Sequence, residues 1–370
     1  MASKFELSID VNYVNSWGVV EAIRELFQNA YDESVQQPEN DYFFSYDKES
    51  SCILIGNKKS VLNTETLLLG CSSKTNDKNT IGQFGEGYKL ATIVLLRTGH
   101  SITFYNYGAR EVWTTKLVKS RKYSGRLVPT FYVEKSHVWE KVPDNDLTIK
   151  IENITEEEYG LIVESNLRLQ NLNSNDILNC SHGKILLSKE YQGKIYVSGL
   201  YVTTVDNYEY GYDINPENIN LDRDRKTIPS FDLSWETSKM WSEHVNTDQF
   251  VNLITSESIP YDINYLSLSS ISSIKNYDPI TITKIRNIIG HGEIPVISQD
   301  MYDRVIAAGG KPHFVNSILY NELLPYLTDS ETCAVHGPTN KERFENWIDK
   351  NKQYLPEESV EEFYELMSRI

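Results

Sequence analysis

Three polar side chains within one predicted helix have the types and spacing to do chemistry on a bound anion. Glu25, Asn29 and Asp32 are separated by four and three residues in the stretch 17–33, so on a helix they form one stripe. A carboxylate can take a proton from a water molecule, and a carboxamide oxygen can ligate a divalent cation. The stripe therefore predicts a site if a phosphate-like ligand lies above it.

The helix that must position this stripe is predicted from the apolar residues between the polar ones. They cover one broad arc at helical spacing, which suits packing on a sheet, and they are Val19, Ala22, Ile23, Leu26, Phe27 and Ala30. A plainer interpretation is that the stripe is only the solvated face of an amphipathic helix. The helix taken alone favours that plainer interpretation.

A glycine-rich loop further along the chain has the composition to hold the ligand. Gly82, Gly85 and Gly87 allow tight turns and close approach of backbone amides. The apolar spacing from Leu90 onward predicts a helix directly after them, and N–H groups at a helix start bind anions. The spacing G-x-x-G-x-G is neither the dinucleotide-binding fingerprint nor a P-loop, which requires Gly-Lys-Ser/Thr.

Together, the helix and the loop resemble two motifs of the GHKL ATPase superfamily. This group contains DNA gyrase B subunits, the ninety-kilodalton heat-shock chaperones, histidine kinases and MutL. The segment ELFQNAYDE matches E-x-x-x-N-x-x-D, and IGQFGEGYK matches G-x-x-G-x-G-x-K. The resemblance implies a Bergerat-type ATP-binding fold, an α/β (α+β) sandwich in which ATP and Mg²⁺ lie between the helix and a lid.

The resemblance also implies roles for individual residues. Glu25 would be the general base on the attacking water, Asn29 the ligand of Mg²⁺, and Asp32 a brace behind them. Lys74, in the polar lid segment, would reach the triphosphate. The phosphates would be held by the loop residues and a following lysine, namely Gly82, Gln83, Phe84, Gly85, Glu86, Gly87 and Lys89.

The sequence departs from the family where a D-x-G-x-G motif would hold the adenine. It reads NKKSV at residues 57–61, so Asn57 takes the place of the Asp and both glycines are absent. A carboxamide can accept from an amino group and donate to a ring nitrogen, so adenine and other bases both fit. Thr148, in a late strand-like run, falls where the family has a Gly-Thr near the base.

Strand-like and helical runs predict three regions. An α+β ATP-binding domain is expected over residues 1–175, with its strands from 101 to 152 forming an antiparallel meander. A β-rich domain is expected over residues 176–256, where the resemblance implies a transducer-like, ribosomal S5-like domain. Residues 257–370 are expected to form a small C-terminal α/β region that serves as an interaction surface.

In the family, the transducer-like domain sends one cationic side chain to the γ-phosphate. The segment NLDR, which ends at Arg223, resembles the loop that carries this arginine in the heat-shock branch. Arg223 is therefore the candidate, with Arg225 next, because a guanidinium binds phosphate in bidentate fashion. A surface ion-pair cluster is the plainer interpretation of both arginines.

The composition narrows the partners. The formal net charge is −16, and such an acidic surface repels nucleic-acid phosphates and anionic lipid, which disfavours direct nucleic-acid binding. Four widely spaced cysteines, the absence of an apolar signal core and the absence of a long apolar run predict a cytoplasmic protein without a membrane segment. We expect ATP and another protein as partners, with a homodimer as a further option.

Two functions remain open at this point. The first is a slow Mg²⁺-dependent ATPase whose lid and domain closure act as a conformational switch. The second is a nucleotide-gated binding or adaptor protein with little or no hydrolysis. The presence of Glu25 favours the first, because binding alone needs no base, and the missing D-x-G-x-G motif favours the second.

Overall fold

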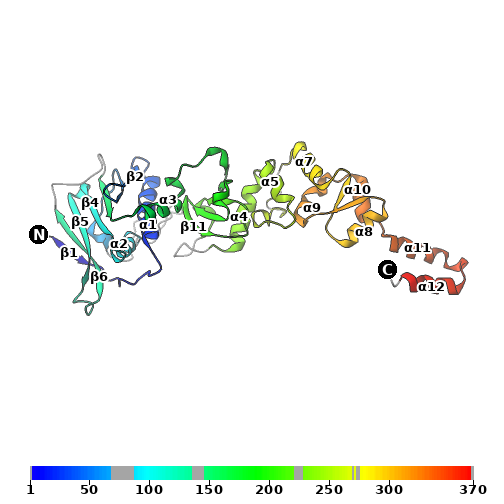
Figure 1. Ribbon diagram of the computed structural model, residues 1–370, viewed down its shortest axis with the longest axis horizontal. Coiled ribbons are helices and arrows are strands. Elements are labelled where there is room, and N and C mark those ends of the chain that lie inside the picture. The colour runs from blue at the N-terminus through cyan, green and yellow to red at the C-terminus, as the bar shows by residue number, and fades with distance from the viewer. Residues whose placement is uncertain are drawn as a thin grey trace. The chain divides into compact units, whose positions relative to one another are not determined.

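The computed structural model describes residues 2–67, 87–135, 146–220, 228–268, 271 and 276–367 of the 370-residue chain. The chain divides into two compact units (Figure 1). The first comprises Met1–Asp176, Ile195–Thr203 and Asp213–Lys226, and the second Ile177–Lys194, Thr204–Tyr212 and Thr227–Ile370. Helices and mainly antiparallel sheets make up both, which confirms the α+β class. The predicted domain boundaries after residues 175 and 256 remain predictions.

The first unit is built on a seven-stranded sheet with the order β1-β6-β5-β4-β7-β3-β2, and neighbouring strands are antiparallel. The meander predicted for the last four strands is correct for β4 to β6 and wrong for β7, which lies between β4 and β3. Both faces of β7 carry buried residues, as suits a central strand. The strands are β1 (Ser3–Glu6), β2 (Tyr42–Asp47), β3 (Cys52–Asn57), β4 (Ser101–Asn106), β5 (Glu111–Lys119), β6 (Leu127–Lys135) and β7 (Leu147–Glu152).

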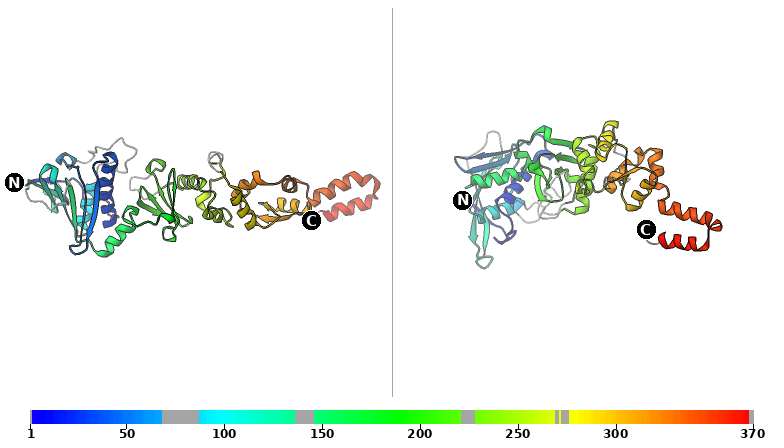
Figure 2. Two further views of the ribbon diagram at one scale, coloured as in Figure 1. Left: turned by 90° about the horizontal axis from the view of Figure 1, so that it is seen from above. Right: turned by 45° about the vertical axis from the view of Figure 1, so that its right-hand side comes forward.

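Helices α1 (Val19–Gln36) and α2 (Gly87–Arg97) form a layer on one face of this sheet (Figure 2). Side chains of a strand alternate between faces, so Ile55 of β3 and Ile149 of β7 point toward the same layer. Both belong to one buried cluster with Ile23 of α1 and Val94 of α2. This two-layer packing fixes where α1 presents its polar side.

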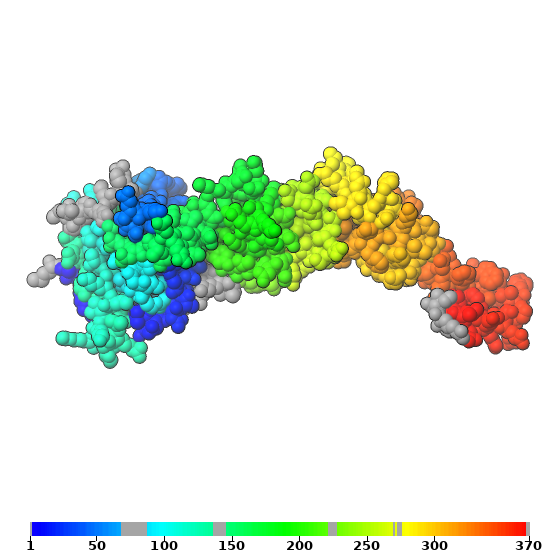
Figure 3. Space-filling model, viewed as in Figure 1, coloured from blue at the N-terminus to red at the C-terminus, as the bar shows by residue number. Residues whose placement is uncertain are grey.

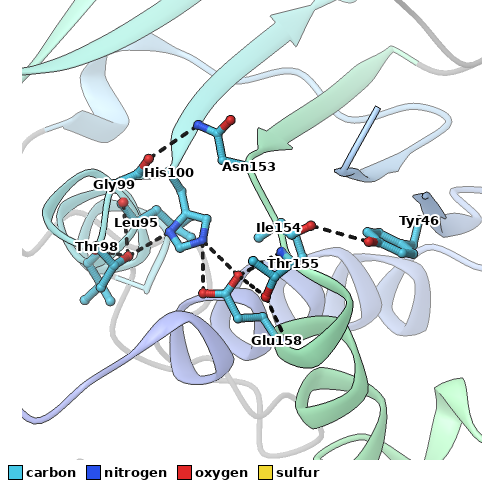
Figure 4. A network of polar contacts seen from close by, with 10 residues as sticks. Tyr46, Leu95, Thr98, Gly99, His100, Asn153, Ile154, Thr155 and Glu158 are labelled. Atoms are coloured by element: carbon cyan, nitrogen blue, oxygen red, sulfur yellow. Dashed lines mark hydrogen bonds and ion pairs between the residues drawn. The ribbon is translucent and has the colours of Figure 1, made fainter. Parts of the chain in front are cut away.

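A polar network in the first unit joins the end of α2 to the start of α3 (Glu156–Glu164) (Figure 4). Thr98 Oγ1 lies 2.9 Å from His100 Nδ1, and His100 Nε2 lies 3.3 Å from Glu158 Oε1. Glu158 also accepts from the amide of Thr155 at 2.9 Å, which completes a capping box on α3. Burial acts to raise the pKa of Glu158, but the hydrogen bonds from Thr155 and His100 hold it below its ordinary value.

The β-rich composition after residue 176 forms a second sheet. Its five strands have the order β11-β10-β12-β9-β8. A tight turn at Ser198 and Gly199, both with positive φ, separates β10 from β11. The strands are β8 (Ile177–Cys180), β9 (Gly183–Leu186), β10 (Lys194–Val197), β11 (Leu200–Thr204) and β12 (Gly211–Ile214).

The second unit is mainly helical and contains one parallel strand pair, β13 (Glu293–Val296) with β14 (Lys311–Phe314). Among the described helices, none combines the length and apolar character that a membrane crossing requires. The helices of this unit are α4 (Ser230–Ser242), α5 (Asp248–Ile254), α7 (Pro279–Ile289), α8 (Gln299–Ala307), α9 (Ser317–Leu323), α10 (Asp329–His336), α11 (Asn340–Asn351) and α12 (Glu357–Met367).

A buried hydrogen-bond network lies inside the second unit around Asp262. This carboxylate accepts from the amides of Glu209 at 3.0 Å and Tyr210 at 3.2 Å, and from the hydroxyl of Tyr212. Trp241 Nε1 donates to the same hydroxyl oxygen at 2.7 Å. Burial raises the pKa of Asp262 by more than its hydrogen bonds lower it, and the resulting pKa is about 6. The carboxyl therefore titrates much closer to neutral pH than an ordinary aspartate.

Candidate functional site

The polar stripe of α1 is largely buried. Glu25 and Asp32 are 6% and 1% exposed, and Asn29 is partly buried. Arg24 Nη2 lies 3.7 Å from Glu25 Oε1. A solvated helix face would leave both carboxylates in water, so that interpretation does not describe Glu25 or Asp32.

The first residue of α2 lies directly against this stripe. A Cβ atom added at Gly87 would lie 2.7 Å from Glu25 Oε2 and 3.3 Å from Asn29 Nδ2. Both distances are shorter than normal van der Waals contact, so glycine is what allows the start of α2 to approach so closely. The fold thus brings together Glu25, Asn29 and Gly87, which are far apart in the sequence.

Lys89 is the other described member of the predicted phosphate set. It lies in α2, it is fully buried, and its Nζ lies 5.7 Å from the centre of the Tyr88 ring. The remaining members lie outside the described residues, as do the arginine candidates. They are Lys74, Gly82, Gln83, Phe84, Gly85, Glu86, Arg223 and Arg225.

The donor atoms of the stripe suit a magnesium ion that keeps phosphate and water oxygens as its other ligands. Such an ion is usually bound through one or two oxygen-bearing side chains plus the phosphates of a substrate. Asn29 offers a carboxamide oxygen, and Glu25 offers a carboxylate one turn away. Within the described part of the chain, no three His, Cys, Asp or Glu side chains gather as a metal site of their own.

The end of β3 carries Asn57 at the candidate base position. Asn57 is 3% exposed, and its Nδ2 donates to the carbonyl oxygens of Ala30 at 2.8 Å and Asn40 at 3.4 Å. Carbonyl oxygens only accept, so these contacts fix the orientation of the carboxamide and leave Oδ1 to accept from a ligand. An aspartate here would set a carboxylate against two carbonyl oxygens. This geometry explains why the chain has the amide.

Two further buried asparagines hold the segment after β3, which contains no glycine. Asn40 accepts from the amide of Lys59 at 2.7 Å and donates to Ser60 Oγ at 3.0 Å. Asn106 accepts from the amide of Leu62 at 3.1 Å and donates to its carbonyl oxygen at 2.7 Å. Sequence reasoning missed both asparagines because their partners lie far away along the chain.

Arg97 at the end of α2 is a second residue that sequence reasoning missed. Its guanidinium donates to the carbonyl oxygens of Val11, Tyr13, Val14 and Trp17, at distances from 2.9 to 3.3 Å. These bonds tie the segment leading into α1 to the end of α2. A basic residue in the last turn of a helix is common, so no local pattern distinguishes this particular role of Arg97.

Thr148 lies on the opposite face of the sheet from Asn57. In the pairing of β3 with β7, Asn57 stands opposite Leu147 and Gly56 stands opposite Thr148. Neighbouring residues of a strand point to opposite faces. Thr148 is 1% exposed, and among the described residues its Oγ1 has no hydrogen-bond partner. The structure therefore does not bring Thr148 together with Asn57.

Comparison with known proteins gives one family match and one curated relative. A family model described as the Mycoplasma pneumoniae MPN635 N-terminal domain matches residues 156–246. An uncharacterised protein of Mycoplasma pneumoniae is 24% identical over 221 residues, which cover 57% of this chain and 86% of that protein.

Two similar solved structures are of the ATPase region of Saccharomyces cerevisiae topoisomerase II. The one bound to ICRF-187 (dexrazoxane) has a TM-score of 0.33 and 12% identity, and the other has a TM-score of 0.32 and 14% identity. Each match covers 50% of this chain and 62% of the yeast chain. The chain thus spans less than two thirds of the length of those structures.

Proposed function

We propose that this chain binds ATP and Mg²⁺ in a GHKL-type site and hydrolyses the nucleotide slowly. The observation that carries the proposal is the close approach of Gly87 to Glu25 and Asn29. A helix start, a carboxylate and a carboxamide thus lie side by side, and a phosphate above them would meet all three.

In this proposal each residue of the stripe has one task. Glu25 takes a proton from the attacking water, and Asp32 braces the set from one turn further along α1. Asn29 would hold Mg²⁺, which when bound neutralises phosphate charge. The amide of Gly87, with those of the preceding loop, would hold the phosphates, and Arg223 would reach the γ-phosphate when the domains close.

The fixed orientation of Asn57 supports adenine as the base. Its Oδ1 can accept from the amino group of adenine, whereas guanine presents an acceptor oxygen at the corresponding position. An unpaired buried acceptor costs roughly 1–3 kcal/mol. We therefore expect GTP to bind about tenfold or more weakly than ATP.

The test is Mg²⁺-dependent phosphate release by wild type and Glu25→Gln, combined with calorimetric titration of ATP, ADP and GTP. Removing a general base slows a reaction by roughly 10²- to 10⁴-fold, so Glu25→Gln should keep ATP binding and lose release. Asn29→Ala should lose Mg²⁺-dependent binding. Glu157→Gln, at an exposed position of α3, is the control and should behave as wild type.

The possible results test the role of Glu25 and nucleotide binding separately. Equal release from wild type and Glu25→Gln would remove Glu25 as the base, and a wild type that binds no nucleotide would end the whole proposal. The second candidate, a nucleotide-gated adaptor, is favoured by the non-glycine segment after β3. It requires that wild type bind ATP without releasing phosphate.

A further inference from the structure

The last two helices of the second unit form a hairpin. α11 and α12 are joined by the short 3-10 turn Lys352–Tyr354 and lie side by side (Figure 1). Ile348 of α11 and Met367 of α12 are buried, and the hydroxyl of Tyr364 donates to Asp349 Oδ1 at 3.0 Å. This hydrogen bond joins the two helices.

The hairpin carries an aromatic groove, which we define as Phe344 and Trp347 of α11 with Phe363 of α12. A cavity of about 520 Å³ lies there and is lined also by Asn340 and Arg343. Phe344 and Trp347 are 56% and 53% exposed. The hairpin surface is drawn in orange and red in Figure 3. Exposed apolar surface gathered in one place is characteristic of a protein interaction site.

Opposite charges run along the two edges of the aromatic groove. Arg343 and Lys350 are two helical turns apart on the outer edge of α11, and Glu358 and Glu362 are one turn apart on the outer edge of α12. Arg343 donates to the carbonyl oxygen of Ala307 at 2.7 Å, a contact that does not neutralise its charge. The groove therefore has a positive edge and a negative edge.

We propose that the aromatic groove binds the same groove of a second copy of this chain, so that two hairpins form a four-helix bundle. A two-fold axis parallel to the helices would place α11 of one chain over α12 of the other, with each positive edge against a negative edge. A two-fold axis across the helices would place like edges together. The charges therefore select the first arrangement, and the aromatic residues of both copies fill its core.

The test is the molar mass of the full chain by sedimentation equilibrium over a concentration series without nucleotide. Wild type should be a reversible dimer, and Trp347→Glu should weaken dimerisation at least tenfold because it places a charge in the apolar core. Tyr354→Glu is the matched control, since Tyr354 is 78% exposed and lies outside the groove. Circular dichroism of each variant checks that the fold is kept.

Charge exchange tests the arrangement itself. Lys350 and Glu358 stand at similar distances from the turn, so they would pair between the two copies. Lys350→Glu and Glu358→Lys should each weaken the dimer, and the double variant should restore it. Failure of the double variant to recover would overturn the arrangement.

The remaining outcomes overturn the proposal. One is a wild type that stays monomeric at every concentration, and another is a Trp347→Glu variant that dimerises as wild type does. A third is a monomeric wild type that binds a helical lysine–leucine peptide in calorimetry while Trp347→Glu does not. That last result would assign the aromatic groove to a basic segment of a different protein.

Discussion

Burying a carboxylate is costly unless its charge is paired or hydrogen-bonded, and α1 buries two of them. Packing a helix on a sheet requires only apolar side chains at such positions. Glu25 is 6% exposed and has Arg24 Nη2 at 3.7 Å, and Asp32 is 1% exposed, so α1 carries two buried carboxylates that packing on a sheet does not require. The start of α2 at Gly87 approaches Glu25 and Asn29 of the same helix.

The substitution Gly87→Ala is expected to reduce phosphate release strongly and to change stability little. Its Cβ would lie 2.7 Å from Glu25 Oε2, which is the end of a side chain and can shift. We expect stability to change by about 1 kcal/mol or less, because alanine also favours the helix, and phosphate release to fall at least tenfold. Gly160→Ala in α3, which meets no atom within 4 Å, should gain about 0.5–1 kcal/mol and keep full release. Unchanged release from Gly87→Ala would contradict the importance of this contact.

An aspartate at position 57 should destabilise this chain. It would remove both donations, to Ala30 and Asn40, and place a buried charge against two carbonyl oxygens. We expect Asn57→Asp to lose about 1–3 kcal/mol in urea denaturation at pH 7. The deficit should shrink on acidification, since a protonated carboxyl can donate again. A fully stable Asn57→Asp would show that the two donations contribute little.

At the scale of elements, hydrophobic periodicity and composition predicted the helices and strands that are determined by residues close together in the sequence. The helix around Glu25, the helix after the glycine loop and most strands of the large sheet have local patterns. Sequence patterns could not predict the place of β7 in the middle of the sheet or the roles of Asn40, Asn106 and Arg97. These features depend on contacts between segments far apart in the sequence, which local patterns do not reveal.

Arg168 shows how such a distant contact links elements inside the first unit. Its guanidinium carbon lies 3.8 Å from the centre of the Tyr31 ring on α1. The same guanidinium donates to the carbonyl oxygen and the hydroxyl of Ser198, at 3.2 and 3.3 Å, in the turn between β10 and β11. A planar guanidinium can stack and donate at once, which lysine cannot do. The helix of the candidate site is thus connected to a strand turn of the second sheet.

The Asp262 network predicts a pH-dependent stability of its elements. The ordinary pKa of 3.8 is raised to about 6, so the fold favours the protonated form. The protonated Asp262 carboxyl contributes most to the free energy of unfolding below about pH 4. This contribution, roughly 3 kcal/mol in total, is lost as the pH rises through about 6. Urea denaturation of wild type and Asp262→Asn from pH 4 to 7 measures this contribution. The stability advantage of wild type should narrow toward pH 7, and parallel profiles would contradict the assignment.

At the scale of the whole molecule, nucleotide and protons should act on different units. α1 and α2 belong to the first unit and Asp262 to the second. Saturating ATP, at about 100 times its Kd, should stabilise the first unit by about 2.7 kcal/mol. Lowering the pH from 7 to 5 should stabilise the second. Glu158 in the first unit has a pKa below its ordinary value of 4.5, so its contribution is lost only at still lower pH.

Hydrogen exchange followed by mass spectrometry can measure the two units separately in the same sample. The expected result is slower exchange in α1 and α2 with ATP, and slower exchange around Asp262 at the lower pH after correction for intrinsic rates. Protection that spreads evenly over both units under either condition would show that they unfold together. In that case the two effects could not be assigned to separate parts of the chain.

The asparagine-held segment after β3 has a thermodynamic consequence. Because Asn40 and Asn106 already fix its backbone through side-chain amides, little conformational entropy is left for a bound base to remove there. A family motif with two glycines would retain more freedom before binding. Under the proposed function, recognition of the base would therefore be closer to rigid docking, and most of the ordering cost of binding a nucleotide would arise in other parts of the site.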